Sequence, residues 1–186
     1  MINSAGAGRW LDLDETTPTE AIQMMGAPYF AAFNLTRAFI ADMLARGSGR
    51  IVNVNSPAAF APWPGATGYT AARWALRGFT QALRADLHGS GIGVMHVVAG
   101  ETDSPYWEHN PGAHERVPLI SGYLGHLSSE QVARAIVRGI EYDRDEVIIP
   151  LVLRATLALN ALWPWAVRRI LIATGRRKGR GHVAAE

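Results

Sequence analysis

Short apolar runs and longer amphipathic stretches alternate along this sequence. Residues 51–55 and 94–98 are short runs rich in β-branched side chains, a composition typical of buried parallel strands. Residues 18–46 and 69–88 are longer and carry apolar side chains at helical spacing. Because glycine-rich segments separate these stretches, the pattern predicts an α/β fold with three layers, in which helices cover both faces of a parallel sheet.

The first long helix has a clear N-terminal signal. Thr17 is suited to the N-cap position, Pro18 to the first helical position and Glu20 to the third. We expect the helix to reach about Arg46 with a bend at Pro28, because proline has no amide hydrogen for the helical ladder. Its apolar side chains wrap widely around it, which predicts burial between the sheet and a partner.

The second long helix is apolar on two sides, and one side should cover the sheet. Trp74 lies beside that side, so it either packs in the core or faces outward toward a partner. Ser128 and Ser129 are suited to capping a later helix, and residues 147–151 predict a final short strand. Between these elements, residues 103–128 are rich in Pro, Gly, His and aromatic side chains, a composition typical of a functional loop.

Composition and charge fit one domain with a distinct C-terminal end. The 186 residues are 48% hydrophobic, enough to bury a core, and they include no cysteine, which together with the absence of a visible secretory signal favours a cytoplasmic location. The net charge is only +2, but residues 151–186 carry seven Arg or Lys and one Glu. We therefore divide the chain into residues 1–150, a main domain, and residues 151–186, an apolar helix with a basic tail.

This C-terminal end has two interpretations. Its uncharged apolar run, residues 155–167, is too short to span a bilayer and contains Pro164. A basic, Trp-bearing helix can lie on an anionic membrane surface as a peripheral contact. The preferred interpretation is that it covers the substrate pocket or a subunit interface. Nucleic-acid binding is not expected, because the basic run is short and no recognition motif accompanies it.

Three side chains around the first predicted strand suggest proton-transfer chemistry. Ser56 follows that strand, and the carboxyl ends of parallel strands are where ligands bind in open sheets. Tyr69 and Arg73 stand four residues apart at the start of the next helix and therefore share a face. A fixed cation beside a tyrosine hydroxyl stabilises the phenolate, and a serine hydroxyl opposite can hold a substrate oxygen.

These residues belong to a wider pattern. Ser56, Tyr69 and Arg73 form S-x12-Y-x3-(basic) after the segment GRIVNVNS, residues 3–6 read N-S-A-G, and residues 96–104 read HVVAGETDS. Over about residues 1–150 the sequence resembles the short-chain dehydrogenase/reductase family. The resemblance implies a Rossmann-like, doubly wound parallel sheet and an oxidoreductase that uses NAD or NADP to interconvert an alcohol and a carbonyl on a small hydrophobic substrate.

The resemblance also implies roles for individual residues. Ser56, Tyr69 and Arg73 would be catalytic, with Tyr69 as general acid/base, and Ser56 would share substrate binding with Tyr106 and Trp107 in a substrate-covering segment at 103–128. No metal site is expected, because the spacing of His109, His114 and the neighbouring glutamates matches no standard ligand set. A homodimer or homotetramer is expected. The residues expected to bind the cofactor are Asn3, Ala5, Gly6, Tyr69, Arg73, Gly100, Thr102 and Ser104.

The sequence departs from the family pattern at several positions. Arg73 stands where the family has lysine, and Pro28 falls where it has its active-site asparagine; Ala99 replaces a proline and Ser104 a threonine. The Gly-rich turn that holds the pyrophosphate is absent, and the G-x-G within residues 3–8 is a poor substitute for it. We therefore expect an N-terminally truncated sheet resembling the C-terminal two-thirds of such an enzyme. A non-catalytic fragment or pseudoenzyme, acting as a binding or dimerisation module, is the alternative.

Overall fold

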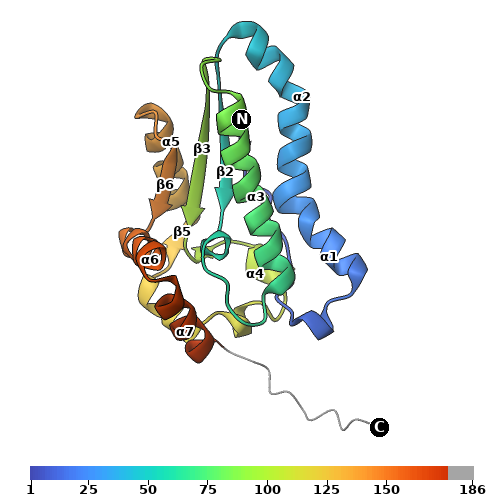
Figure 1. Ribbon diagram of the computed structural model, residues 1–186, viewed down its shortest axis with the longest axis vertical. Helices are drawn as coiled ribbons and strands as arrows, with labels where there is room; N and C mark the ends of the chain where they lie inside the picture. The colour runs from blue at the N-terminus through green and yellow to red at the C-terminus, as the bar shows by residue number, and fades with distance from the viewer. Residues whose placement is uncertain (176–186) are drawn as a thin grey trace.

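The computed structural model describes residues 1–175 and contains a parallel sheet of four strands (Figure 1). The strands are β1 (Ile2–Asn3), β2 (Gly49–Asn55), β3 (Ile92–Ala99) and β6 (Glu146–Ile149), hydrogen-bonded in the order β1-β2-β3-β6. All three pairings are parallel. The predicted parallel sheet is confirmed, and its last strand ends two residues earlier than predicted.

Helices α2 (Ala31–Arg46) and α3 (Thr67–Asp86) cover one face of the sheet. Ile51 and Val94, paired across β2 and β3, are buried on this face together with Met43 of α2. The next residue along each strand, Val52 or Met95, points to the opposite face, because side chains alternate along a strand.

The opposite face packs against α5 (Ser129–Glu141). Val52, Met95 and Val97 form a buried cluster there with Ile136. Ser128 caps α5 by accepting a hydrogen bond from the Gln131 amide, as the sequence predicted. Helices on both faces complete the three-layer α/β architecture.

The long N-terminal helix is bent at the predicted place. It begins as α1 (Pro18–Met25) after the Thr17 cap, passes through a π-helical segment at Gly26–Phe30, and continues as α2. Pro28 lies buried inside the π segment, whose wider turn accommodates a residue without an amide hydrogen. Gly47 ends α2 in the left-handed conformation, with φ 62°.

The outer side of this helix pair is not covered by the described chain. Phe33, Leu35 and Phe39 of α2 are all exposed, so the burial predicted for them is not provided by residues 1–175. Trp74 on α3 is 46% exposed, and the interpretation of it as a core residue is therefore wrong. An exposed aromatic and aliphatic surface remains on this side of the molecule.

Residues 103–128 are irregular, as their composition predicted. They contain α4 (Tyr106–His109) and two 3-10 segments, η4 (His114–Arg116) and η5 (Leu119–Leu124). A small parallel ladder between β4 (Thr102–Asp103) and β5 (Leu127–Ser128) ties the two ends of the segment together. Two further 3-10 segments, η1 (Leu13–Glu15) and η3 (Pro57–Ala59), lie in the connections nearer the N-terminus.

The C-terminal end forms a pair of helices at the lower end of the molecule in Figure 1, α6 (Leu151–Leu162) and α7 (Pro164–Thr174). Leu153 and Leu157 of α6 pack on Val98 of β3. Within residues 1–175, no helix has both the length and the apolar character required to cross a bilayer. The basic tail predicted after Gly175 lies outside the described residues.

Candidate active site

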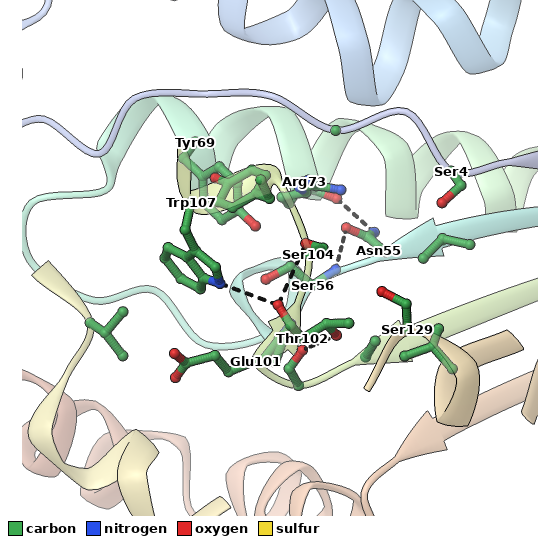
Figure 2. Close-up of a pocket in the computed structure, with 18 of the residues that line it drawn as sticks. Ser4, Asn55, Ser56, Tyr69, Arg73, Glu101, Thr102, Ser104, Trp107 and Ser129 are labelled. Atoms are coloured by element: carbon green, nitrogen blue, oxygen red, sulfur yellow. Dashed lines mark hydrogen bonds between the residues drawn. The ribbon is translucent and has the colours of Figure 1, made fainter. Parts of the chain in front are cut away.

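A cavity of about 420 Å³ lies at the carboxyl ends of the central strands (Figure 2). Ser4 and Gly6 follow β1, Ser56 follows β2, and Gly100 and its neighbours follow β3. Because all the strands are parallel, their ends converge at the same edge of the sheet. This topology brings together side chains that are far apart in the sequence.

Ser56 lies at the cavity wall where β2 turns into η3. Its hydroxyl accepts a hydrogen bond from the Ala58 amide at 3.3 Å, and its own amide donates to Asn55 Oδ1 at 2.9 Å. Among the described residues no acceptor is found for the hydroxyl hydrogen. Ser56 is therefore held by its backbone and remains able to donate to an oxygen in the cavity.

Tyr69 and Arg73 lie on the first turns of α3 and face the cavity from the same side (Figure 2). They are 5% and 7% exposed, and the guanidinium carbon of Arg73 is 5.0 Å from the centre of the Tyr69 ring. This distance is typical of a cation–π contact. The structure thus brings together Ser56, Tyr69 and Arg73 around one cavity, as the sequence predicted.

Arg73 is a buried cation with unused hydrogen-bonding capacity. Its Nε is buried with no partner among the described residues, and no carboxylate there forms an ion pair with it. Gly6 makes room for the guanidinium, since a Cβ on Gly6 would lie 2.6 Å from Arg73 Nη2. An unpaired buried cation favours an anionic or strongly polar group in the cavity.

Aromatic side chains enclose the Tyr69 ring. Trp10 lies 5.2 Å from it and 5.1 Å from Trp63, centre to centre. The Trp10 indole donates to the Tyr106 hydroxyl at 3.0 Å, and that hydroxyl donates to the Gly8 carbonyl at 3.2 Å. Trp107 completes this apolar wall.

The surroundings of Tyr106 shift the pKa of its hydroxyl. Burial raises the pKa of Tyr106 well above its usual value, and the nearby Tyr69 raises it further. Tyr106 therefore remains protonated at neutral pH and can act only as a neutral hydrogen-bonding group. Of the two tyrosines, Tyr69 is the one whose ring lies beside the Arg73 cation at 5.0 Å.

The turn after β3 supplies hydroxyl groups and backbone to the opposite side of the cavity. Gly100, Thr102 and Ser104 all line it. The Thr102 hydroxyl donates to the Gly100 carbonyl at 3.0 Å, and the Trp107 indole donates to the Thr102 carbonyl at 3.2 Å. These contacts hold the turn against residues 103–128.

Two residues expected to bind the cofactor lie elsewhere. Asn3 is buried in β1, where its side chain donates to Asn53 Oδ1 at 2.7 Å, and it does not line the cavity. Ala5 is exposed and is also absent from the lining. Ser4, between them, does line it. The N-S-A-G segment thus contributes Ser4 and Gly6, and residues 4–12 run as irregular chain with no helix directly after the G-x-G.

Asn55 connects the catalytic candidates through a buried network that sequence reasoning missed. Its Nδ2 donates to the Arg73 carbonyl at 3.1 Å and approaches His96 Nε2 at 3.0 Å. His96 Nδ1 lies 3.3 Å from Glu146 Oε1. With Asn55 Nδ2 as donor, Nε2 accepts, and Nδ1 faces the Glu146 carboxylate. A hydrogen bond from His96 lowers the pKa of Glu146 below its usual value. The sequence signal for such a network was the presence of Asn53 and Asn55 in an otherwise hydrophobic strand.

Glu101 lies at the cavity rim between two histidines. Its Oε1 is 3.2 Å from His114 Nε2 and 3.4 Å from His126 Nδ1, and both imidazoles are exposed. His109 instead faces the Pro105 carbonyl. Within residues 1–175 no group of three or more His, Asp or Glu side chains is arranged to hold a metal ion.

Comparison with known proteins agrees with this architecture. The model of the short chain dehydrogenase family matches residues 1–113. SadH, a Mycobacterium tuberculosis protein named as an oxidoreductase, is 25% identical over 190 residues, which cover 93% of this chain and 65% of SadH. The 3-dehydrosphinganine reductase of Danio rerio is 32% identical over 139 residues, 74% of this chain and 42% of that protein.

A solved structure shows the same fold. A short chain dehydrogenase from Burkholderia cenocepacia in complex with NADP superposes with a TM-score of 0.76 at 24% identity, covering 91% of this chain and 67% of that one. The chain thus spans about two thirds or less of the length of each of these relatives. At 24% sequence identity, this similarity supports a common fold and nothing more.

Proposed function

The chain belongs to the short-chain dehydrogenase family, and from this premise we propose that it is an NAD(P)-dependent oxidoreductase that interconverts an alcohol and a carbonyl. One observation carries the proposal. Ser56, Tyr69 and Arg73 come from two separate elements and meet in a single cavity walled by tryptophans. A hydroxyl donor, a tyrosine and a fixed cation are the groups that proton transfer to a carbonyl oxygen requires.

Each of the three side chains has a distinct role. The Ser56 hydroxyl donates to the substrate oxygen and orients it toward Tyr69. Tyr69 gives its hydroxyl proton to that oxygen as the carbonyl is reduced and takes it back in the reverse direction. Arg73 stabilises negative charge on the tyrosine oxygen and offers its guanidinium at the cavity wall to a polar group of the cofactor.

The lining fits the nicotinamide end of a dinucleotide. Ser4, Thr102 and Ser104 offer hydroxyl groups, and Gly6 and Gly100 place backbone along the same wall. When bound, the nicotinamide supplies or accepts the hydride. Related structures are named as complexes with NADP, with NADPH and with NAD. Residues 4–12 offer no helix N-terminus for the pyrophosphate, so this part of the proposal concerns the nicotinamide side only.

The walls favour a hydrophobic substrate. Trp10, Trp63 and Trp107 provide apolar surface, while the polar groups are concentrated at Ser56 and the turn after β3. Two relatives are named as reductases of 3-dehydrosphinganine and 3-ketodihydrosphingosine, ketones that carry long aliphatic chains. We therefore propose a small or chain-like hydrophobic alcohol or ketone as the substrate class.

A homodimer or homotetramer is part of the proposal. The aromatic surface on α2 and α3, with Phe33, Phe39 and Trp74 exposed, supports it. Burial of these side chains against a second copy would complete the packing that residues 1–175 leave open.

The direct test is a titration of the 186-residue chain with NADPH and NADH, followed by nicotinamide fluorescence and by melting temperature. Saturable binding is expected, and it raises the melting temperature by mass action. Tyr69→Phe should keep binding and fold while lowering turnover of a hydrophobic ketone by about a hundredfold or more. Tyr29→Phe, on the π segment away from the cavity, is the matched control and should leave turnover unchanged.

Each negative result has a defined meaning. A folded chain that binds neither nucleotide would favour the alternative of a non-catalytic fragment that acts as a binding or dimerisation module, to which Arg73 and Pro28 at the family's Lys and Asn positions also point. Binding together with full activity of Tyr69→Phe would instead contradict the assignment of the proton donor.

A further inference from the structure

The inner face of the hairpin formed by α6 and α7 packs against the rest of the protein. Leu153 and Leu157 of α6 and Val167 of α7 are buried, and α7 contacts η5 in the segment that covers the cavity. Among residues 151–175 none lines the cavity, so the interpretation that this end covers the substrate pocket or a subunit interface stays a prediction. The outer face requires a separate explanation.

The outer face of α6 is largely apolar, with the exposed Arg154 at its edge. Residues 151, 155, 158 and 162 recur at helical spacing, so they form one stripe, and Val152 and Leu159 widen it. All six residues are exposed, Leu151 by 77%. A solvent-facing helix surface normally carries polar side chains, so this helix is apolar on both its inner and its outer face.

The outer face of α7 is amphipathic in a different way. Trp165 and Ile172 lie seven residues apart on one stripe and are 57% and 48% exposed, and Trp163 is exposed at the joint between the helices. Arg168 and Arg169 flank that stripe on either side, and the Arg169 guanidinium lies 5.8 Å from the Trp165 ring. Tryptophan beside arginine next to an aliphatic surface is typical of helices that lie at a membrane–water interface.

The charged side chains of the hairpin itself are all cationic. Residues 151–175 contain three arginines and no acidic residue. Arg154 of α6 also borders a groove lined by Arg134, Arg138, Arg144 and Glu146, in which arginines outnumber the one carboxylate. The sequence beyond the described residues continues with Arg176, Arg177, Lys178 and Arg180. Charge of one sign around an apolar surface is complementary to a surface of acidic lipid headgroups.

We propose that the outer face of α6–α7 docks on the surface of an anionic lipid bilayer. The leucines and tryptophans enter the interfacial region, and the flanking arginines contact the headgroups. A second copy of this chain is a poorer occupant, because a two-fold contact through this face would place arginine against arginine without any acidic partner in residues 151–175.

Docking would also bring the cavity close to the bilayer. Segment η5 contacts α7 and contributes Ser121 to the cavity wall, so one short segment links the docked helix to the proposed active site. This consequence rests on the proposed function, whereas docking itself does not depend on catalysis and is tested without it.

The test is co-sedimentation of the full chain with vesicles of phosphatidylcholine alone and of phosphatidylcholine with phosphatidylglycerol. We expect binding to the acidic vesicles, weakened by added salt. Arg168→Gln with Arg169→Gln should lower the affinity for acidic vesicles by about tenfold or more, and Leu162→Gln with Trp165→Gln should lower it comparably. Ile22→Gln, an exposed apolar side chain on α1 that belongs neither to the hairpin nor to the proposed subunit surface, is the control and should bind like the unmodified chain.

Size-exclusion chromatography of the same variants measures their oligomeric state. The proposal is overturned if the chain fails to bind acidic vesicles, or if it binds while the hairpin variants bind equally well. If instead the hairpin variants change the oligomeric state and vesicle binding is absent, the face is an interface between copies of the chain. Circular dichroism confirms that each variant is folded before either assay.

Discussion

The cavity and the C-terminal hairpin depart from the usual distribution of side chains in opposite directions. At the cavity and directly beneath it, polar groups are buried: Arg73, in the cavity wall, is 7% exposed, and His96, in the network below, is 3% exposed. On the hairpin, large apolar side chains are exposed, with Leu151 and Trp165 more than half accessible. Both departures cost free energy in the isolated chain, since buried charge and exposed hydrophobic surface are each unfavourable. They indicate surfaces built for something that residues 1–175 do not contain, a polar ligand in one region and an apolar neighbour in the other.

The largest expected difference is in the free energy of unfolding when a tryptophan is truncated in one region or in the other. Trp10 is buried against Tyr69 and Trp63, so Trp10→Ala should lower the free energy of unfolding by about 3–5 kcal/mol. Trp165→Ala on the hairpin should change it by less than about 0.5 kcal/mol, because the side chain is already accessible to water. Urea denaturation of both variants measures the difference. Equal destabilisation would show that the hairpin tryptophan packs against the body of the protein.

The charge on Arg73 provides the next contrast. Arg73→Met removes the cation beside Tyr69 and should lower turnover by about a hundredfold, whereas Arg73→Lys keeps the charge and should retain most of the activity. No carboxylate among the described residues pairs with the Arg73 cation, so Arg73→Met should not reduce the melting temperature. Steady-state kinetics with thermal denaturation checks both statements. Loss of activity in Arg73→Lys as well would mean that the guanidinium fork, and not the charge, is required.

Gly6→Ala tests how closely the cavity fits around that cation. The new methyl group would lie 2.6 Å from Arg73 Nη2, the far end of a flexible side chain, so the guanidinium should move at a cost of about 1 kcal/mol or less in stability while nucleotide binding weakens. Gly78→Ala is the matched control, since nothing lies within 4 Å of its Cβ position and it is in the interior of α3. That control should be neutral or slightly stabilising. Similar effects of the two changes would argue against a tight fit at Gly6.

The smallest effect concerns pH and the network beneath the cavity. His96 lowers the pKa of Glu146, so the carboxylate stabilises the folded state above its usual pKa of 4.5, and this contribution is lost as the pH falls through the lowered value. Glu146→Gln should therefore flatten the acid side of the stability profile by less than about 1 kcal/mol, because the group is partly exposed. Urea denaturation between about pH 3 and pH 6 compares the two proteins. Glu130→Gln is the control, because Glu130 is exposed and pairs with Arg134 instead of His96. An identical response of both variants would exclude the His96 contact as the cause.

Local physical chemistry made much of this molecule predictable from its sequence. The capping residues at Thr17 and Ser128 and the bend at Pro28 depend on neighbours within one or two turns. The shared face of Tyr69 and Arg73 follows from helical spacing, and the place of Ser56 follows from the end of a strand. Parallel strands then bring these ends to one edge, which is why the catalytic candidates could be named in advance.

Only the tertiary structure decided what surrounds them. Trp10 and Trp63 meet over Tyr69 from segments more than 50 residues apart, and no local pattern specifies that contact. The same holds for Asn55 and His96, which meet across two strands, and for Asn3, whose side chain turns into the sheet rather than the cavity. Exposure of Trp74 and of the outer α6–α7 face likewise depends on which helices pack beside them. Periodicity states which residues share a face, but only the assembled layers determine whether that face meets the core, water or a partner.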